Sequence, residues 1–274
     1  MLKLMKYEIK GTYKYILAIL ALVLLLFTAI QLYVKYNGPM MGLGGVTLIS
    51  ISTLIIFGSM LATFLYIVGS FKKELYEDRG YLTFSLPLSG RKFVGAKLLV
   101  ATAWFLLLGL VTGIYNLLFA LQIVDGDFLS VFKDMLTNFP VRAALLRGIG
   151  MIMSIISLIL IIYFSMALSR VTFQNKRIGG LWFVIFLVLS IFLAYGQFKI
   201  AGLFPYYLDL QSFTVAKLDS FLNLHVNIEI NNGVSVSASS GTDMVNIASM
   251  FYNVIVLASL FIGTSYFVER KIDL

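Results

Sequence analysis

Six long stretches of this chain contain no Asp, Glu, Lys or Arg, and they limit its fold more than any other feature. They are residues 15–34, 36–71, 98–124, 148–169, 178–198 and 244–268. A helix needs about 20 apolar residues to cross a hydrocarbon core of about 30 Å. The second stretch begins with a loop, because residues 36–45 include Pro39 and four glycines. The sequence therefore predicts an all-α polytopic membrane protein with six transmembrane helices.

The composition excludes several classes of protein. Hydrophobic residues make up 60% of the 274 residues and charged residues 12%, whereas a soluble domain is about 45–50% apolar and about 25% charged. This chain has too few polar side chains to cover a surface in water, which excludes a water-soluble enzyme or a nucleic-acid-binding domain. We therefore expect membrane lipids, and no nucleic acid, among its partners. With no Cys and one His, thiol chemistry and Cys/His metal sites are excluded as well.

The basic residues predict the orientation in the membrane. Six crossings place both chain ends on one side, and that side holds 15 of the 21 Lys and Arg residues. Basic residues accumulate on the cytoplasmic side of membrane proteins. We therefore expect a multi-pass protein of the cell membrane with both termini in the cytoplasm.

The whole chain, residues 1–274, is expected to form a single transmembrane domain with three distinctive regions outside the spans, residues 1–14, 72–97 and 199–243. In residues 1–14, lysines recur at spacings of three and four on one face of a helix, which predicts an N-terminal amphipathic interfacial helix. The outer loop at 199–243 is 45 residues long. Its alternating residues around Asn232-Gly233 predict a small β-hairpin with a type I′ turn.

Uncharged polar residues in the spans are candidates for a translocation path. Asn246, Ser249 and Asn253 are spaced three and four apart, so they are expected to share one face of the sixth helix, and Asn116 lies in the third. The alternative is that such groups only hydrogen-bond between helices. Because the six stretches contain no ionisable side chain, ion-coupled transport and catalysis inside the membrane are disfavoured. We expect no catalytic residue, no metal and no cofactor on this chain.

The sequence also contains no energy source of its own. A phosphate-binding loop needs the pattern G-x-x-x-x-G-K-[ST]. The nearest match, GRKFVGAKL at residues 90–98, has Ala96 before Lys97 and no hydroxyl after it. Directed transport would therefore depend on a partner that hydrolyses a nucleotide.

The connection at residues 72–97 is the best candidate for docking that partner. Its charged residues are followed by Tyr81, Leu82, Phe84 and Leu86, and then by Pro87. An apolar cluster surrounded by charge is typical of a protein docking surface. The alternative is a purely structural hairpin, which could be shorter.

These features together resemble the permease subunit of type-2 ATP-binding-cassette (ABC) transporters of Gram-positive bacteria. The specific motif is Lys73-Glu74-x-x-Glu77-Asp78-Arg79-Gly80 followed by Leu86-Pro87-Leu88-Ser89. The resemblance implies that a coupling helix at residues 74–88 fits a groove on a separate cytosolic ABC ATPase, which binds the ATP and Mg. It also implies a dimer with a second copy or a paralogue. The residues expected to make the ATPase contact are Glu74, Glu77, Asp78, Arg79, Tyr81, Phe84, Leu86 and Pro87.

The expected function is thus export of an amphipathic substrate, such as a peptide antibiotic or a lipid, by a subunit that is not itself an enzyme. Two alternatives stay open. One is a mechanotransmission or sensory permease that docks an ATPase but moves no substrate. The other is a membrane-embedded lipid-modifying enzyme with its chemistry in the outer loop, where the candidate residues are Asp209, Asp219, Glu229 and His225.

Overall fold

A computed structural model of the chain describes residues 1–37, 43–76, 89–123, 133, 141–172, 180–210, 212–217, 224–230, 234–240 and 244–270. Its helices are α1 (Leu2–Asn37), α2 (Leu43–Tyr76), α4 (Gly90–Ile123), α6 (Val141–Thr172), α7 (Leu181–Leu203) and α8 (Ile247–Arg270). Within these ranges, all six helices are long and apolar enough to cross a membrane. The prediction of a multi-pass, mainly α-helical membrane protein with six spanning helices is confirmed.

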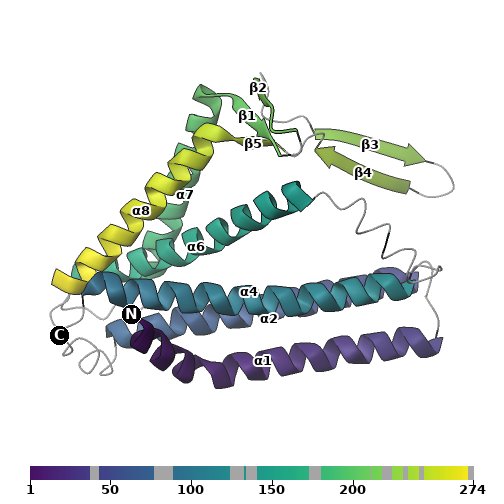
Figure 1. The fold of residues 1–274 in the computed structure, drawn as a ribbon, viewed down its shortest axis with the longest axis horizontal. Helices are drawn as coiled ribbons and strands as arrows, with labels where there is room; N and C mark the ends of the chain where they lie inside the picture. Colours follow the sequence, from purple (N-terminus) through teal and green to yellow (C-terminus); the bar gives the residue numbers. More distant parts are fainter. Residues whose placement is uncertain are drawn as a thin grey trace.

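The helices converge at one end of the molecule and diverge toward the other (Figure 1). The start of α1 and the end of α8 both lie at the convergent end, which we call the terminal end. Helices α1, α2 and α4 run side by side in one arm, and α7 and α8 form a second arm. Helix α6 packs against α7 and α8 and also contacts α2 and α4, so it joins the two arms.

The core lies between α2, α4, α6 and α8, in their halves nearest the terminal end. Its centre is Phe71 of α2, whose ring stacks on Tyr163 of α6 with 3.8 Å between ring centroids, and both residues are fully buried. The Phe93 ring of α4 also lies near Phe71, with 6.2 Å between the ring centroids. In lipid, apolar surface gains little from leaving the solvent, so close packing of this kind is what holds helices together.

Two small sheets lie beyond the distal ends of α7 and α8 (Figure 1). One is antiparallel with strand order β2 (Val215–Lys217), β1 (Tyr206–Asp209), β5 (Met244–Asn246). The other pairs β3 (Leu224–Ile230) with β4 (Val234–Ser240), with Ile228 opposite Val236. The three-stranded sheet was not predicted, because strands of three or four residues carry no readable periodicity. It takes up the first residues of the sixth uncharged stretch, so α8 begins at Ile247.

The helices extend beyond the uncharged stretches from which they were predicted. Helix α1 is continuous from Leu2, so residues 1–14 belong to the first spanning helix, although its first turns run at an angle to the rest (Figure 1). Helix α2 continues to Tyr76, and α4 already begins at Gly90. The spanning helices therefore include charged residues near the terminal end, beyond the uncharged stretches.

Candidate functional site

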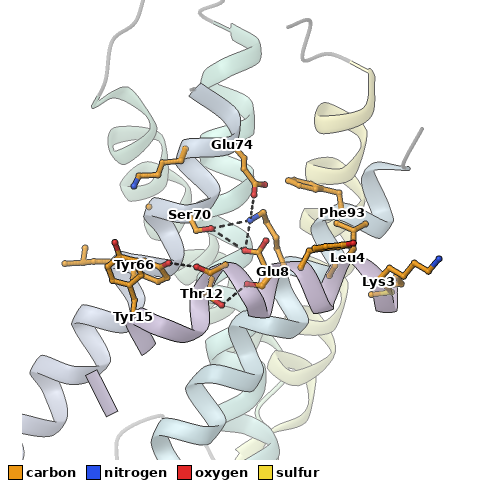
Figure 2. A pocket seen from close by; sticks show the side chains of 17 residues that line it. Lys3, Leu4, Glu8, Thr12, Tyr15, Tyr66, Ser70, Glu74 and Phe93 are labelled. Atoms are coloured by element: carbon orange, nitrogen blue, oxygen red, sulfur yellow. Dashed lines mark hydrogen bonds and ion pairs between the residues drawn. The ribbon is translucent and has the colours of Figure 1, made fainter. Parts of the chain in front are cut away.

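A pocket of about 990 Å³ lies between α1, α2 and α4 at the terminal end. Figure 2 shows Glu8, Ser70 and Glu74 pointing toward one another at its centre. The pocket is lined by acidic and basic side chains, several hydroxyl groups and apolar side chains. Its lining residues on α1 are Lys3, Leu4, Tyr7, Glu8, Gly11, Thr12 and Tyr15; those on α2 are Leu65, Tyr66, Gly69, Ser70, Lys73 and Glu74; those on α4 are Phe93, Ala96 and Lys97.

One lysine holds two carboxylates from different helices in this pocket. The Lys97 Nζ lies 2.7 Å from Oε1 of Glu8 and 3.0 Å from Oε1 of Glu74. We call these three residues the charge triad. The Lys97 side chain is 4% exposed, and the two carboxylate side chains are 18% and 19% exposed. The triad is therefore largely removed from water, where the attraction between its charges is much stronger than at a surface.

The Ser70 hydroxyl adds two hydrogen bonds to the triad. The Ser70 hydroxyl donates to Oε1 of Glu8 at 3.3 Å and accepts from Lys97 Nζ at 3.4 Å. Ser70 and Glu74 are four residues apart on α2, so helix geometry places both on the face that meets Lys97. The Lys97 ammonium also lies 5.7 Å from the centre of the Phe93 ring, within cation–π range.

A second set of contacts fastens α1 to its neighbours one turn further into the membrane. Thr12 follows Glu8 by four residues, and its hydroxyl accepts a hydrogen bond from Nε1 of Trp104 on α4 at 3.0 Å. The Tyr66 hydroxyl of α2 donates to the backbone carbonyl of Gly11 at 3.2 Å. The Tyr66 ring also lies against Tyr15, with 4.7 Å between the centroids. Helix α1 is therefore joined to both α2 and α4.

The first turn of α4 is held by α8 as well. The backbone N–H of Gly90 donates to Oε2 of Glu269 at 2.9 Å. An N-terminal N–H has no partner within its own helix, and a carboxylate at this position also interacts favourably with the helix dipole. Gly90 packs directly against the backbone carbonyl of Ser265, where a side chain would not fit. Four helices thus meet where the segment 77–88 leaves α2 and returns to α4.

Of the residues expected to contact an ATPase, only Glu74 lies within the described ranges. Its carboxylate faces Lys97 inside the helix bundle, rather than outward. Glu77, Asp78, Arg79, Tyr81, Phe84, Leu86 and Pro87 lie outside the described residues. Their role in docking stays a prediction.

The candidate path residues do not form one cluster. Asn246 ends β5 rather than lying in the sixth helix, and its Oδ1 accepts from the backbone N–H of Ser249 at 2.8 Å, which caps α8. Its Nδ2 donates to the carbonyl of Phe204, just beyond α7, at 2.9 Å. Asn253 lies one turn beyond Ser249 on α8 and is half-buried. Asn116 bonds to its own helix backbone on the distal part of α4, which diverges from α8 (Figure 1).

Sequence reasoning missed the charge triad, although one signal was available. Glu8 is the only acidic residue among the first 14, and it lies between four lysines of the same helix. At about 100° per residue, Glu8 lies on the side of the helix opposite the lysines. A lone acid there, with Thr12 one turn away, indicates that this side of the helix meets a cation. Nothing in the sequence indicates that the cation is Lys97, which is 89 residues away.

In the described part of the chain, no three His, Asp or Glu side chains gather in a way that could hold a metal ion. The chemistry that the triad offers is electrostatic. It can hold three helices in a fixed arrangement, and it can present a carboxylate to a ligand in the pocket. Comparisons with family models, with curated proteins and with solved structures found no match for this chain.

Proposed function

We propose that this chain is the permease subunit of an ATP-driven ABC-type exporter, which moves an amphipathic substrate outward with the help of a separate cytosolic ATPase. One observation carries the proposal. The charge triad and the contact between Glu269 and Gly90 tie four helices together at the two points where the segment 77–88 joins the bundle. A force applied to that segment would reach α1, α2, α4 and α8 together.

The orientation belongs to the same proposal. The terminal end would face the cytoplasm, because most basic residues precede, follow or connect the helices at that end. The first turns of α1 would lie at the inner membrane surface, where Leu2 and Tyr7 are 82% and 72% exposed and available to lipid. The sheets would then lie outside the cell, where they would close the exit.

The length of α4 would allow it to act as a lever that pivots about Lys97. Lys97 lies seven residues from the start of α4 and 26 from its end at Ile123, which corresponds to about 10 Å and 39 Å at 1.5 Å per residue. A rigid tilt about Lys97 would magnify a displacement at the cytoplasmic end about fourfold. Because α1 and α2 are bound to Lys97 and α8 holds the start of α4, the distal part of this arm would move relative to the distal ends of α7 and α8.

In this mechanism, each predicted site residue has a place. Glu77, Asp78 and Arg79 would provide charge complementarity to the ATPase, and Tyr81, Phe84, Leu86 and Pro87 the apolar contact. We assign Glu74 to transmission within the permease, because its carboxylate bonds to Lys97. A second copy or a paralogue would complete the path, with Asn116, Asn246, Ser249 and Asn253 as its candidate polar residues.

The proposal is tested with the chain and a cytosolic ABC ATPase that co-purifies with it, reconstituted together in liposomes. Glu77→Lys combined with Tyr81→Ala should abolish substrate-stimulated ATP hydrolysis and uptake of a fluorescent amphipathic peptide or lipid into inverted vesicles. Membrane insertion should be unchanged, because both residues lie outside the six uncharged stretches. A matched control is Glu229→Lys combined with Tyr206→Ala at the opposite end of the molecule, which should leave ATP hydrolysis stimulated.

Three results would contradict the proposal. If the Glu77/Tyr81 variant still coupled ATP hydrolysis to substrate flux, this segment would not be the docking site for the ATPase. Stimulated ATP hydrolysis without flux would favour a mechanotransmission permease instead. Product formation from a lipid by the chain alone, lost when Asp209, Asp219, Glu229 and His225 are replaced together, would favour an enzyme.

A further inference from the structure

The pocket beside the charge triad has the features of a ligand site, apart from its part in joining helices. Its volume of about 990 Å³ is at the upper end of the range for small-molecule sites. It lies between the first turns of α1 and the last turns of α2, close to the start of α4. In a membrane this level corresponds to the boundary between headgroups and acyl chains, because Lys97 directly precedes the uncharged stretch of α4.

The floor of the pocket offers a carboxylate to a cationic group. Both hydrogen bonds that Glu8 makes through its carboxylate to described residues, from Lys97 and Ser70, are to Oε1. Oε2 is therefore left to accept from a ligand, and the Glu8 side chain retains 18% exposure. A primary ammonium has three N–H donors, enough to bond Oε2 of Glu8 and a neighbouring hydroxyl together.

The walls are aromatic and apolar. Tyr7, Tyr15 and Tyr66 all line the pocket, and Tyr15 is 63% exposed. Aromatic faces attract ammonium groups, and tyrosines are typical of the membrane–water boundary. Leu65, which also lines the pocket, is 59% exposed on the surface of α2. That surface would contact the upper part of an acyl chain.

The rim is basic. Lys3 and Lys73 line the pocket, and both are exposed. Figure 2 shows that the Lys3 side chain extends away from the triad, so its ammonium lies to one side of Glu8. A ligand with an ammonium at the floor and a phosphate at the rim would match this order of charges, because basic residues at this depth bind lipid phosphates.

We infer that this pocket binds a membrane lipid with a phosphoethanolamine headgroup, whose primary amine meets Glu8 and whose phosphate meets Lys3 and Lys73. Such binding needs no ATPase, so the inference goes beyond the proposed function and fails or succeeds independently of it. The same headgroup chemistry could come from free phosphoethanolamine. The exposed apolar wall beside the pocket favours the lipid.

Lipid binding is measured by native mass spectrometry of the purified chain, titrated with lipids that have identical acyl chains. Phosphatidylethanolamine should bind about tenfold more tightly than phosphatidylcholine, whose trimethylammonium cannot donate a hydrogen bond, since one charge-assisted bond is lost. Glu8→Gln should abolish that preference while keeping an oxygen for Lys97. Lys73→Gln should weaken the binding of both lipids. The matched control is Lys72→Gln, because Lys72 is an exposed neighbour outside the pocket, and this substitution should weaken the binding of neither lipid.

The result that overturns the inference is equal binding of the two lipids to the unmodified chain, or a preference that survives in Glu8→Gln. Tighter binding of phosphatidylglycerol than of phosphatidylethanolamine would also overturn it, because that lipid has a phosphate and no amine. If soluble phosphoethanolamine bound as tightly as the lipid, the assignment to a lipid would be wrong. Should Glu8→Gln fail to fold, Glu8→Asp keeps the charge, and its shorter side chain should still reduce the preference.

Discussion

Replacing Lys97 with methionine should strongly destabilise this protein. Methionine has nearly the same length as lysine but no charge, so Glu8 and Glu74 would face each other without the ammonium that lies 2.7 and 3.0 Å from them. Removing one member of a buried ion pair costs about 3–5 kcal/mol, because the remaining charge has no compensation. The cation–π contact with Phe93 would be lost as well.

The assay is thermal unfolding in mild detergent, followed by tryptophan fluorescence. Lys97→Met should lower the midpoint by roughly 10 °C, given about 2–4 °C per kcal/mol for a chain of this size. The matched variant replaces the whole triad with uncharged residues of similar shape, Glu8→Gln, Glu74→Gln and Lys97→Met together. It should recover most of the stability, because a buried ionic cluster is often no more stable than a neutral one of the same volume.

Two results would refute this reasoning. An unchanged midpoint in Lys97→Met would mean that the carboxylates find water or another cation, so the triad does not hold the helices. If the triple variant were as unstable as the single one, the loss would come from lysine packing rather than from uncompensated charge. A stable triple variant that no longer couples ATP hydrolysis to flux would assign the triad to transmission.

Three further predictions concern helix contacts and are checked by the same unfolding assay. Gly90→Ala should lower the free energy of unfolding by about 1–3 kcal/mol, because its Cβ would meet a backbone carbonyl of α8. Gly11→Ala has open space around its Cβ and should raise the free energy of unfolding by about 0.5–1 kcal/mol through helix propensity. Equal effects of the two substitutions would contradict the packing of Gly90 against α8. Asn246→Ala should lower the free energy of unfolding by about 1–2 kcal/mol, because it removes the cap of α8. Asn246→Asp should retain part of the stabilisation that the cap provides. In a double-mutant cycle, Trp104→Phe and Thr12→Val should be coupled by about 0.5–1.5 kcal/mol, and additive effects would exclude their hydrogen bond.

Much of the fold was predictable because the membrane simplifies the problem. A spanning segment must satisfy its own backbone hydrogen bonds and exclude charge over about 20 residues. Both requirements act on contiguous residues, so they can be read directly along the chain. Helix ends were less predictable, since charged residues such as Lys97 and Glu74 continue the helix where it leaves the apolar layer.

The candidate site was not predictable in the same way. Glu8, Glu74 and Lys97 lie on three helices, and each alone resembles an ordinary charge at the end of a span. The sequence also suggested one polar face for Asn246, Ser249 and Asn253, whereas Asn246 lies in β5 and caps the helix. The short strand that displaces the helix start depends on pairing with β1, 37 residues earlier, which no local pattern reports.

By itself, therefore, the sequence determined that this chain has six helices able to span a membrane and around which residues each is centred, because hydrophobicity and helix length are properties of neighbouring residues. Only the tertiary structure decided that α1, α2 and α4 share one buried lysine, that α8 holds the start of α4, and that a pocket opens beside them. Those features depend on which helix faces which. In lipid that choice is made by close packing and a few buried polar contacts between residues far apart in the chain.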